Sequence, residues 1–263
     1  MSKTVMLIHG AWLTPLGWES FRKFIEDRGY QVVAPPWPYE DVPIEELRLS
    51  PDRRLRKLTV GKIVDHYDKL IRELPEAPII IGHSYGGLVA QKLLDRGLGA
   101  AGVALDPAPV RGVMPRPRAL RSALPVFIAP FGWRRVLKQS FRTFRKTFAQ
   151  TLPESRKRAV YDRYWAPTPG RLYYQGALAI GTGIHPRNPD RPPLLLIAGE
   201  KDITITPSMV RATFRKQRHA PSLTAFKSFP GRSHFLFAEP GWEEIADYAI
   251  RWAGEHQRTP AGP

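Results

Sequence analysis

The chain has 263 residues, with 40 Lys and Arg against 24 Asp and Glu, no cysteine, and a formal net charge of +16 at neutral pH. The length suits a single α/β domain that carries an insertion, and the lack of cysteine excludes a disulfide framework and thiolate chemistry. No stretch approaches the ~20 apolar residues of a membrane span, and the apolar N-terminal run is too short for a signal peptide, so we expect a cytoplasmic protein.

Strand and helix patterns alternate through the first part of the chain. Short apolar runs predict buried strands, and apolar residues spaced three and four apart predict helices. The strands are expected at residues 3–9, 30–34, 78–81 and 101–105, and the helices at 18–28, at 59–74 and from 88 to 94. Thr59 is placed to cap the second of these helices, and residues 36–58 are expected to form a polar, proline-bearing excursion.

The same alternation returns near the C-terminus after one long interruption. Strands are expected at 193–198 and 223–229, and helices at 207–219 and 242–254. We therefore predict an α/β fold with a mostly parallel six-stranded sheet flanked by helices. Residues 107–190 contain no clear strand and are expected to form a helical cap inserted after the fourth strand. The core then comprises residues 1–106 and 191–258, and residues 259–263 form a flexible tail.

One serine lies between two glycines where a predicted strand gives way to a helix. Residues 79–90 read IIIGHSYGGLVA, with Ser84 between Gly82 and Gly86. A strained turn at this point lifts a serine hydroxyl clear of the sheet, and only glycine lets the neighbouring backbone pass so closely. The motif indicates a nucleophile, although a tight turn with an incidental serine has the same pattern.

Two later loops supply the base and the acid that a serine nucleophile needs. The segment LLLIAGEKD ends a buried strand and leads to Asp202, and SFPGRSHF follows the last strand and presents His234. Because all three residues follow parallel strands, we expect Ser84, Asp202 and His234 at the same edge of the sheet. Glu200 in the same turn and Asp106, directly after the strand at 101–105, are alternatives for the acid.

Two backbone N–H groups are also needed, to bind the oxyanion that forms when a serine attacks an ester. Tyr85 follows the nucleophile and supplies the first. The loop HGAW after the first strand should supply the second, from Ala11 or else from Trp12. We expect His9 to order this loop rather than to take part in the chemistry.

Four loops resemble those of the α/β-hydrolase superfamily, in the same order. IHGAW, GHSYGG, AGEKD and GRSHF are similar to its oxyanion loop, nucleophile elbow, acid turn and histidine loop. The chain resembles in particular the compact branch with plant methylesterases and hydroxynitrile lyases, because its first strand begins within four residues of Met1. The resemblance implies a serine hydrolase and favours Asp202 over Asp106 as the acid. It leaves the reaction open, since the superfamily includes esterases, lipases, lactonases, thioesterases, lyases and perhydrolases.

The predicted cap holds most of the excess positive charge. Residues 107–158 contain 13 basic residues and one acidic residue, Glu154. Residues 131–152 predict a basic amphipathic helix, with an apolar face of Trp133, Leu137, Phe141, Phe144 and Phe148 and with the basic residues Arg134, Arg135, Lys138, Arg142, Arg145 and Lys146. This helix either covers the site as a plain cap or contacts an anionic membrane or an acidic carrier protein. No nucleic-acid-binding module accompanies the charge, so no nucleic acid partner is expected.

These features together predict a serine hydrolase that cleaves a carboxylic ester, lactone or thioester through an acyl-enzyme. Its substrate is expected to be a small acyl compound, amphiphilic or anionic. No His, Asp and Glu cluster has ligand spacing, so no metal and no cofactor are expected. Two alternatives stay open. One is an acyl transferase or thioesterase acting on acidic carrier-linked substrates, and the other is a nonhydrolytic lyase or perhydrolase using the same three residues.

Overall fold

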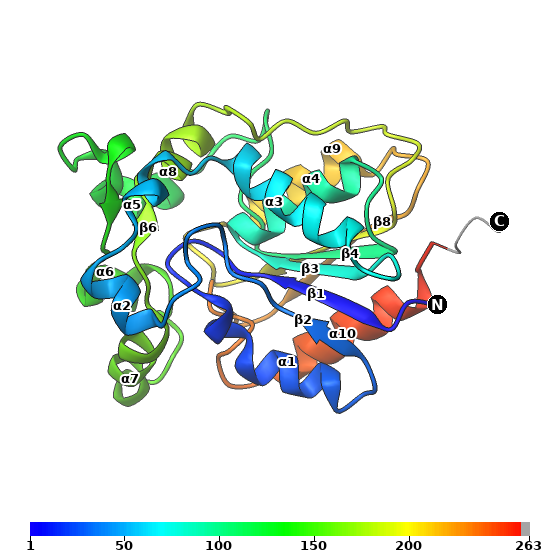
Figure 1. The fold of residues 1–263 in the computed structure, drawn as a ribbon, viewed down its shortest axis with the longest axis horizontal. Helices are drawn as coiled ribbons and strands as arrows, with labels where there is room; N and C mark the ends of the chain where they lie inside the picture. The colour runs from blue at the N-terminus through cyan, green and yellow to red at the C-terminus, as the bar shows by residue number, and fades with distance from the viewer. Residues whose placement is uncertain (259–263) are drawn as a thin grey trace.

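A six-stranded parallel sheet forms the centre of the molecule in the computed structural model, which describes residues 1–258 (Figure 1). Its strands lie in the order β2-β1-β3-β4-β7-β8. Their bounds are β1 Thr4–Ile8, β2 Gln31–Val33, β3 Ile79–His83, β4 Ala101–Leu105, β7 Leu194–Gly199 and β8 Thr224–Phe229. The predicted six-stranded sheet is therefore confirmed, and every pairing in it is parallel. The predicted tail at 259–263 lies outside the described residues.

Helices cover both faces of this sheet (Figure 1). One face carries α3 (Val60–Arg72), α4 (Tyr85–Asp95) and α9 (Pro207–Gln217), and the other carries α1 (Glu19–Glu26) and α10 (Trp242–Glu255). Strands β1, β3, β4 and β7 are buried along their whole length, which explains why they are continuous apolar runs rather than alternating ones. Thr59 caps α3 as predicted, because its side chain accepts a hydrogen bond from the backbone N–H of Lys62.

Three short helical segments and the start of one helix differ from the predicted pattern of the core. The excursion at 36–58 contains α2 (Ile44–Leu49) and the 3-10 helix η2 (Arg53–Lys57), and another 3-10 turn, η1 (Pro15–Trp18), precedes α1. Helix α4 begins directly after Ser84 rather than at residue 88. Both proline and short length weaken the periodic signal of α2 and η2, so a period-based prediction misses them.

The helices and strands between β4 and β7 lie to one side of the sheet, at the left of Figure 1, and the chain after α8 then runs back along α4 to reach β7. These elements are α5 (Pro117–Phe127), η3 (Gly132–Arg134), β5 (Val136–Leu137), α6 (Phe141–Thr147), α7 (Glu154–Tyr164), β6 (Thr168–Pro169) and α8 (Gly170–Ala177). Strands β5 and β6 pair antiparallel, so the expectation of no strand in residues 107–190 is wrong. We refer to residues 107–190 as the cap.

The predicted basic helix at 131–152 is not continuous. Phe131 adopts a left-handed conformation with φ 53°, η3 follows, and the chain then extends into β5. A new helix, α6, begins after Ser140, whose side chain accepts a hydrogen bond from the N–H of Thr143. The predicted basic residues are therefore split between η3, α6 and the residues on either side of β5, and Phe144 is buried in the core rather than on an amphipathic surface.

Within residues 1–258, no helix is both long and apolar enough to cross a membrane.

Candidate active site

Ser84 lies in a strained turn between β3 and α4, as the motif predicts. Its backbone has φ 54° and ψ −118°, a conformation that side chains rarely adopt. A Cβ atom at Gly82 would lie 2.1 Å from the carbonyl oxygen of Gly86, and one at Gly86 would lie 2.1 Å from that of Ile8. The two glycines therefore allow backbones to approach at distances that no other residue permits, and the turn presents Ser84 in a pocket.

His234 and Asp202 form a buried hydrogen-bonded pair at the same edge of the sheet. The His234 Nδ1 atom lies 2.5 Å from the Asp202 Oδ2 atom, and both residues are at most 3% exposed. The other carboxylate oxygen of Asp202 accepts from the backbone N–H groups of Thr204, at 2.6 Å, and Ile205, at 2.9 Å. Three donors thus hold the carboxylate in place, and an N–H on His234 Nδ1 leaves Nε2 as the basic nitrogen of the ring.

The alternative acids do not contact His234 through a hydrogen bond within residues 1–258. Glu200 is exposed. Asp106 is fully buried, and its Oδ1 atom accepts from the backbone N–H of Gly199 at 2.8 Å. Burial, followed by the neighbouring Asp202 charge, raises the pKa of Asp106 well above its ordinary value. Asp202 is therefore the carboxylate that bonds to His234, and the raised pKa of Asp106 favours the neutral form of that neighbouring carboxyl group.

Asp106, Asp202 and His234 together offer donor atoms that all lie within 4.8 Å of one another. Such a cluster could in principle hold a metal ion. Here His234 Nδ1 and Asp202 Oδ2 bond to each other, and one oxygen of each carboxyl group, Oδ1 of Asp202 and Oδ1 of Asp106, accepts backbone N–H groups. Hydrogen bonds within the cluster account for the arrangement, as they do for a base with its orienting acid.

The loop after β1 is tied to the cap in a way that bears on the oxyanion site. The backbone N–H of Trp12 donates to Thr168 Oγ1 at 2.5 Å, the carbonyl of Trp12 accepts from the N–H of Ala166 at 2.8 Å, and the indole N–H donates to the Tyr173 hydroxyl. The Trp12 N–H is therefore engaged. Within residues 1–258 the backbone N–H groups of Ala11 and Tyr85 donate to no acceptor, and both residues line the pocket.

His9 is fully buried beneath this loop and has no access to the pocket. Its Nδ1 atom lies 3.0 Å from the Gly10 carbonyl, and its Nε2 atom accepts from the backbone N–H of Trp37 at 3.3 Å. Burial lowers the pKa of His9 to about 4, so the ring is neutral near pH 7. These contacts agree with a role in ordering the loop.

Two residues that the sequence did not single out support the histidine loop. Glu239 accepts from the backbone N–H of Ser233 at 2.8 Å and from its hydroxyl at 2.9 Å. His83 lies with its ring centre 4.6 Å from that of His234, and its Nε2 atom is 2.9 Å from the His234 carbonyl oxygen. His83 stands inside the serine motif, which could have marked it, whereas nothing near Glu239 in the sequence distinguishes it from a surface carboxylate.

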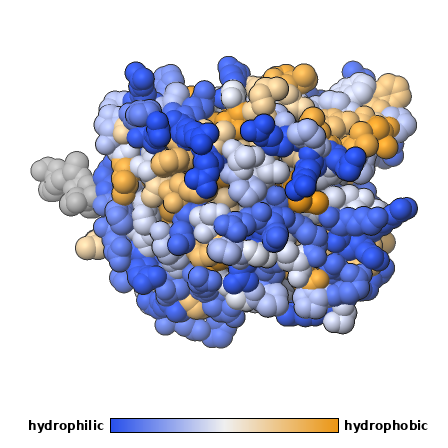
Figure 2. All heavy atoms as spheres, turned by 180° about the vertical axis from the view of Figure 1, so that it is seen from behind, coloured by the Kyte–Doolittle hydropathy of each residue, from blue (hydrophilic) through white to orange (hydrophobic). Residues whose placement is uncertain are grey.

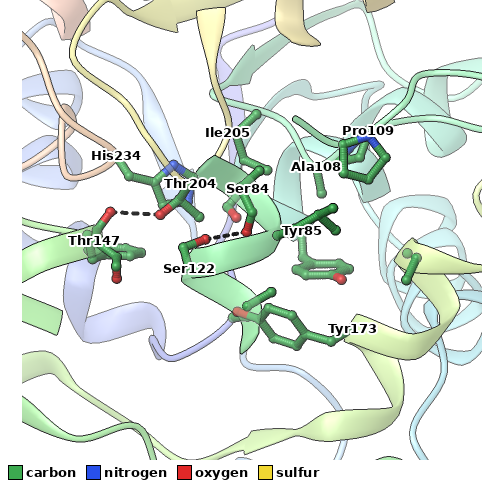
Figure 3. Close-up of a pocket in the computed structure, with 18 of the residues that line it drawn as sticks. Ser84, Tyr85, Ala108, Pro109, Ser122, Thr147, Tyr173, Thr204, Ile205 and His234 are labelled. Atoms are coloured by element: carbon green, nitrogen blue, oxygen red, sulfur yellow. Dashed lines mark hydrogen bonds between the residues drawn. The ribbon is translucent and has the colours of Figure 1, made fainter. Parts of the chain in front are cut away.

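Ser84 and His234 open onto a largely apolar pocket between the sheet edge and the cap (Figure 3). It holds about 750 Å³ of empty space, including its open mouth. From the cap, α5 contributes Ala119, Leu120, Ser122, Ala123 and Phe127, and Phe148 and Tyr173 also line the pocket. Phe148 packs edge-on against His234, with ring centres 4.8 Å apart. No Lys, Arg, Asp or Glu is among the lining residues in the part of the chain that the structure describes.

Comparisons with known proteins agree with the fold of the chain. The chain resembles the structure of a Paleococcus ferrophilus monoacylglycerol lipase (TM-score 0.67, 22% identity, 96% of this chain and 94% of that one). It also resembles a pyrethroid hydrolase from Sphingobium faniae (0.68, 19%, 97% and 98%) and a methylesterase from Arabidopsis (0.68, 13%, 96% and 99%). A sequence comparison with curated proteins finds no match. The model of the alpha/beta hydrolase family matches residues 5–248, and the chain belongs to that family.

Proposed function

We propose that the protein is a carboxylic ester hydrolase that works through an acyl-enzyme on Ser84, His234 and Asp202. The observation that carries this proposal is the buried 2.5 Å contact between His234 and Asp202, in a pocket that also contains Ser84 on its strained turn. The relatives in structure include proteins named as a lipase, a pyrethroid hydrolase and a methylesterase, which favours an ester over other acyl substrates.

The reaction follows from the roles of these groups. The Ser84 oxygen attacks the ester carbonyl carbon while its proton passes to His234 Nε2, and Asp202 stabilises the imidazolium that results. The N–H groups of Ala11 and Tyr85 bind the oxyanion of the tetrahedral intermediate. His234 then gives its proton to the departing alkoxide, leaving an acyl-enzyme. Water, deprotonated by the same histidine, releases the acid and restores Ser84.

The lining of the pocket favours an uncharged, apolar acyl or alcohol group. A largely apolar pocket with a few polar groups, among them Ser84 and His234, has the composition of sites that bind small organic molecules. Placing a carboxylate or phosphate in the pocket would cost free energy, because no cationic side chain lines it. The anionic substrate considered from the net charge is therefore less favoured than an amphiphilic one.

Labelling with a fluorophosphonate probe tests the proposal directly. The wild-type protein and the control variant Ser208→Ala, which changes a serine on α9, should both be labelled and should hydrolyse p-nitrophenyl butyrate. Ser84→Ala should take up no label and lose at least about 10³-fold in kcat. Persistent labelling of Ser84→Ala, or unchanged turnover, would show that the nucleophile lies elsewhere.

A further inference from the structure

Large apolar side chains gather on the outer surface of the cap. Along α5 and the turn after it, Leu124 is 49% exposed, Ile128 is 70% exposed and Phe131 is 65% exposed. The adjoining end of α8 exposes Leu178 and Ile180, and the hydroxyl of Tyr174 on α8 bonds to the carbonyl of Phe127. We call Leu124, Ile128 and Phe131 the apolar stripe. Figure 2 shows hydrophobic side chains gathered on the cap side of the molecule, at its upper right, with hydrophilic ones beside them.

Arginines accompany this stripe without matching acids. Five exposed arginines lie on or next to α5 and η3, namely Arg116, Arg118, Arg121, Arg134 and Arg135. None of them forms an ion pair with any residue in the range 1–258. Elsewhere, exposed arginines such as Arg22, Arg96 and Arg163 pair with carboxylates. The positive charge around the stripe is therefore uncompensated.

The stripe is continuous with the mouth of the pocket. Leu120 is 46% exposed and yet lines the pocket, one helical turn before Leu124 on the same side of α5. Ala123 and Phe127, on the same helix, also line the pocket. Any surface that covers the stripe therefore lies against the entrance through which an apolar substrate reaches Ser84.

We propose that the outer face of α5 and of the turn and η3 that follow it, from Arg116 to Arg135, docks on an anionic lipid surface, with the apolar stripe in the acyl region and the arginines at the head groups. An interface of this kind takes apolar side chains and cations side by side, and needs no complementary protein surface. A second copy of the chain would bring arginines against arginines. An acidic protein or a nucleic acid would satisfy the charges and leave the stripe exposed. The docking is a property of the surface and does not depend on the proposed ester hydrolysis.

Vesicle flotation with the full-length protein tests the docking. Phosphatidylcholine vesicles are compared with vesicles that also contain about 30 mol% phosphatidylglycerol, at low and at high salt. Wild type should float with the anionic vesicles and lose this binding at high salt. Arg118→Gln with Arg121→Gln should weaken binding about 30-fold, the usual effect of two arginines at such a surface. Leu124→Ser with Ile128→Ser and Phe131→Ser should weaken it at least about tenfold.

A matched control separates docking from net charge. Arg215→Gln with Arg218→Gln removes the same charge at the C-terminal end of α9, which packs on β7 and β8 of the sheet and lies outside the cap, and should bind as wild type does (Figure 1). Equal losses in the control and in the Arg118, Arg121 variant would overturn the proposal, as would wild-type binding by the stripe variant. Light scattering that reveals a wild-type dimer, broken by the stripe substitutions and without vesicle binding, would assign the face to a second copy instead. Circular dichroism checks that each variant is folded.

Discussion

Replacing Asp106 by asparagine tests whether a second carboxyl group beside His234 carries charge. Asp106 Oδ1 accepts the Gly199 N–H, and its Oδ2 atom has no hydrogen-bond donor within residues 1–258. Burial and the neighbouring Asp202 raise the pKa of Asp106, so we expect a neutral acid near pH 7 that donates its proton toward Asp202. Asparagine keeps the acceptor for Gly199 and puts an N–H₂ donor in place of the hydroxyl. The variant should therefore keep the wild-type kcat/KM within about threefold.

The effect that an ionised Asp106 would have on His234 can be calculated from the distance between them. An ionised Asp106 would lie within 4.8 Å of the His234 ring nitrogen. At an effective dielectric constant of about 20, that charge would favour the imidazolium form of His234 by about 3.5 kcal/mol, which corresponds to about 2.5 pH units. Asp106→Asn would then move the acid limb of the pH–rate profile to lower pH by up to this amount. The charges of Asp202, His83 and Glu239 are the same in both proteins and cancel in the comparison.

The measurement is kcat/KM for p-nitrophenyl butyrate from about pH 5 to about pH 9, a range that spans the titration of an ordinary histidine. We expect the acid limbs of wild type and Asp106→Asn to coincide. Asp202→Asn is the comparison variant and should lose on the order of 10⁴-fold in kcat, because an amide no longer enforces the required tautomer of His234. A downward shift of more than one pH unit in Asp106→Asn would refute the neutral assignment.

Four further substitutions test the packing, electrostatics and hydrogen bonding of the fold. Gly86→Ala should lower the free energy of unfolding by at least about 3 kcal/mol in a denaturant titration, because its Cβ would lie 2.1 Å from the Ile8 carbonyl oxygen. Gly61→Ala in α3 is the control, because the nearest atom to its Cβ would be 3.9 Å away, and it should raise the free energy of unfolding by about 0.5–1 kcal/mol. Burial raises the pKa of Glu40 well above that of the unfolded chain, so the wild type loses stability as pH rises through the interval between these values; Glu40→Gln should gain in thermal stability relative to wild type from about pH 5 to about pH 8, and a constant difference would contradict this. Thr168→Val leaves the Trp12 N–H without its acceptor and should cost about 1–3 kcal/mol in the same titration; an unchanged midpoint would mean that the bond contributes nothing net.

The sheet and the residues at its edge could be predicted because local chemistry specifies them. Fully buried strands need continuous apolar runs, and the turn around Ser84 needs glycines on both sides, so both leave a mark in the sequence. Chain order then identified His234 and Asp202, which the structure brings into contact. The raised pKa of Asp106 could not be foreseen, because it depends on burial from all sides.

The cap was less predictable because its helices are short and its breaks depend on tertiary contacts. The aromatic spacing across 131–152 matches a helix, but a Cβ at Gly132 would lie 2.5 Å from the carbonyl oxygen of Val126, so the chain turns sharply there. Ser140 is a favourable N-cap residue, and its side chain accepts the N–H of Thr143 at the start of α6. A prediction based on apolar periodicity alone does not use this signal and so places the start of the helix too early. The sequence pattern predicts the basic surface on a helix at residues 131–152, whereas the docking surface proposed from the structure lies mainly on α5.

Trp12 forms three hydrogen bonds to residues 166–173, and these bonds distinguish parts of the cap that should tolerate substitution to different degrees. The loop that carries Ala11 is hydrogen-bonded through Trp12 to the segment from Ala166 to Tyr173, so we expect a substitution in that segment to disturb the proposed oxyanion site as well. Helix α5 supplies much of the pocket wall and makes none of these bonds. Substrate preference can therefore diverge through α5 while the catalytic geometry is preserved, and libraries aimed at new esters should vary its pocket-facing positions Ala119, Ser122, Ala123 and Phe127.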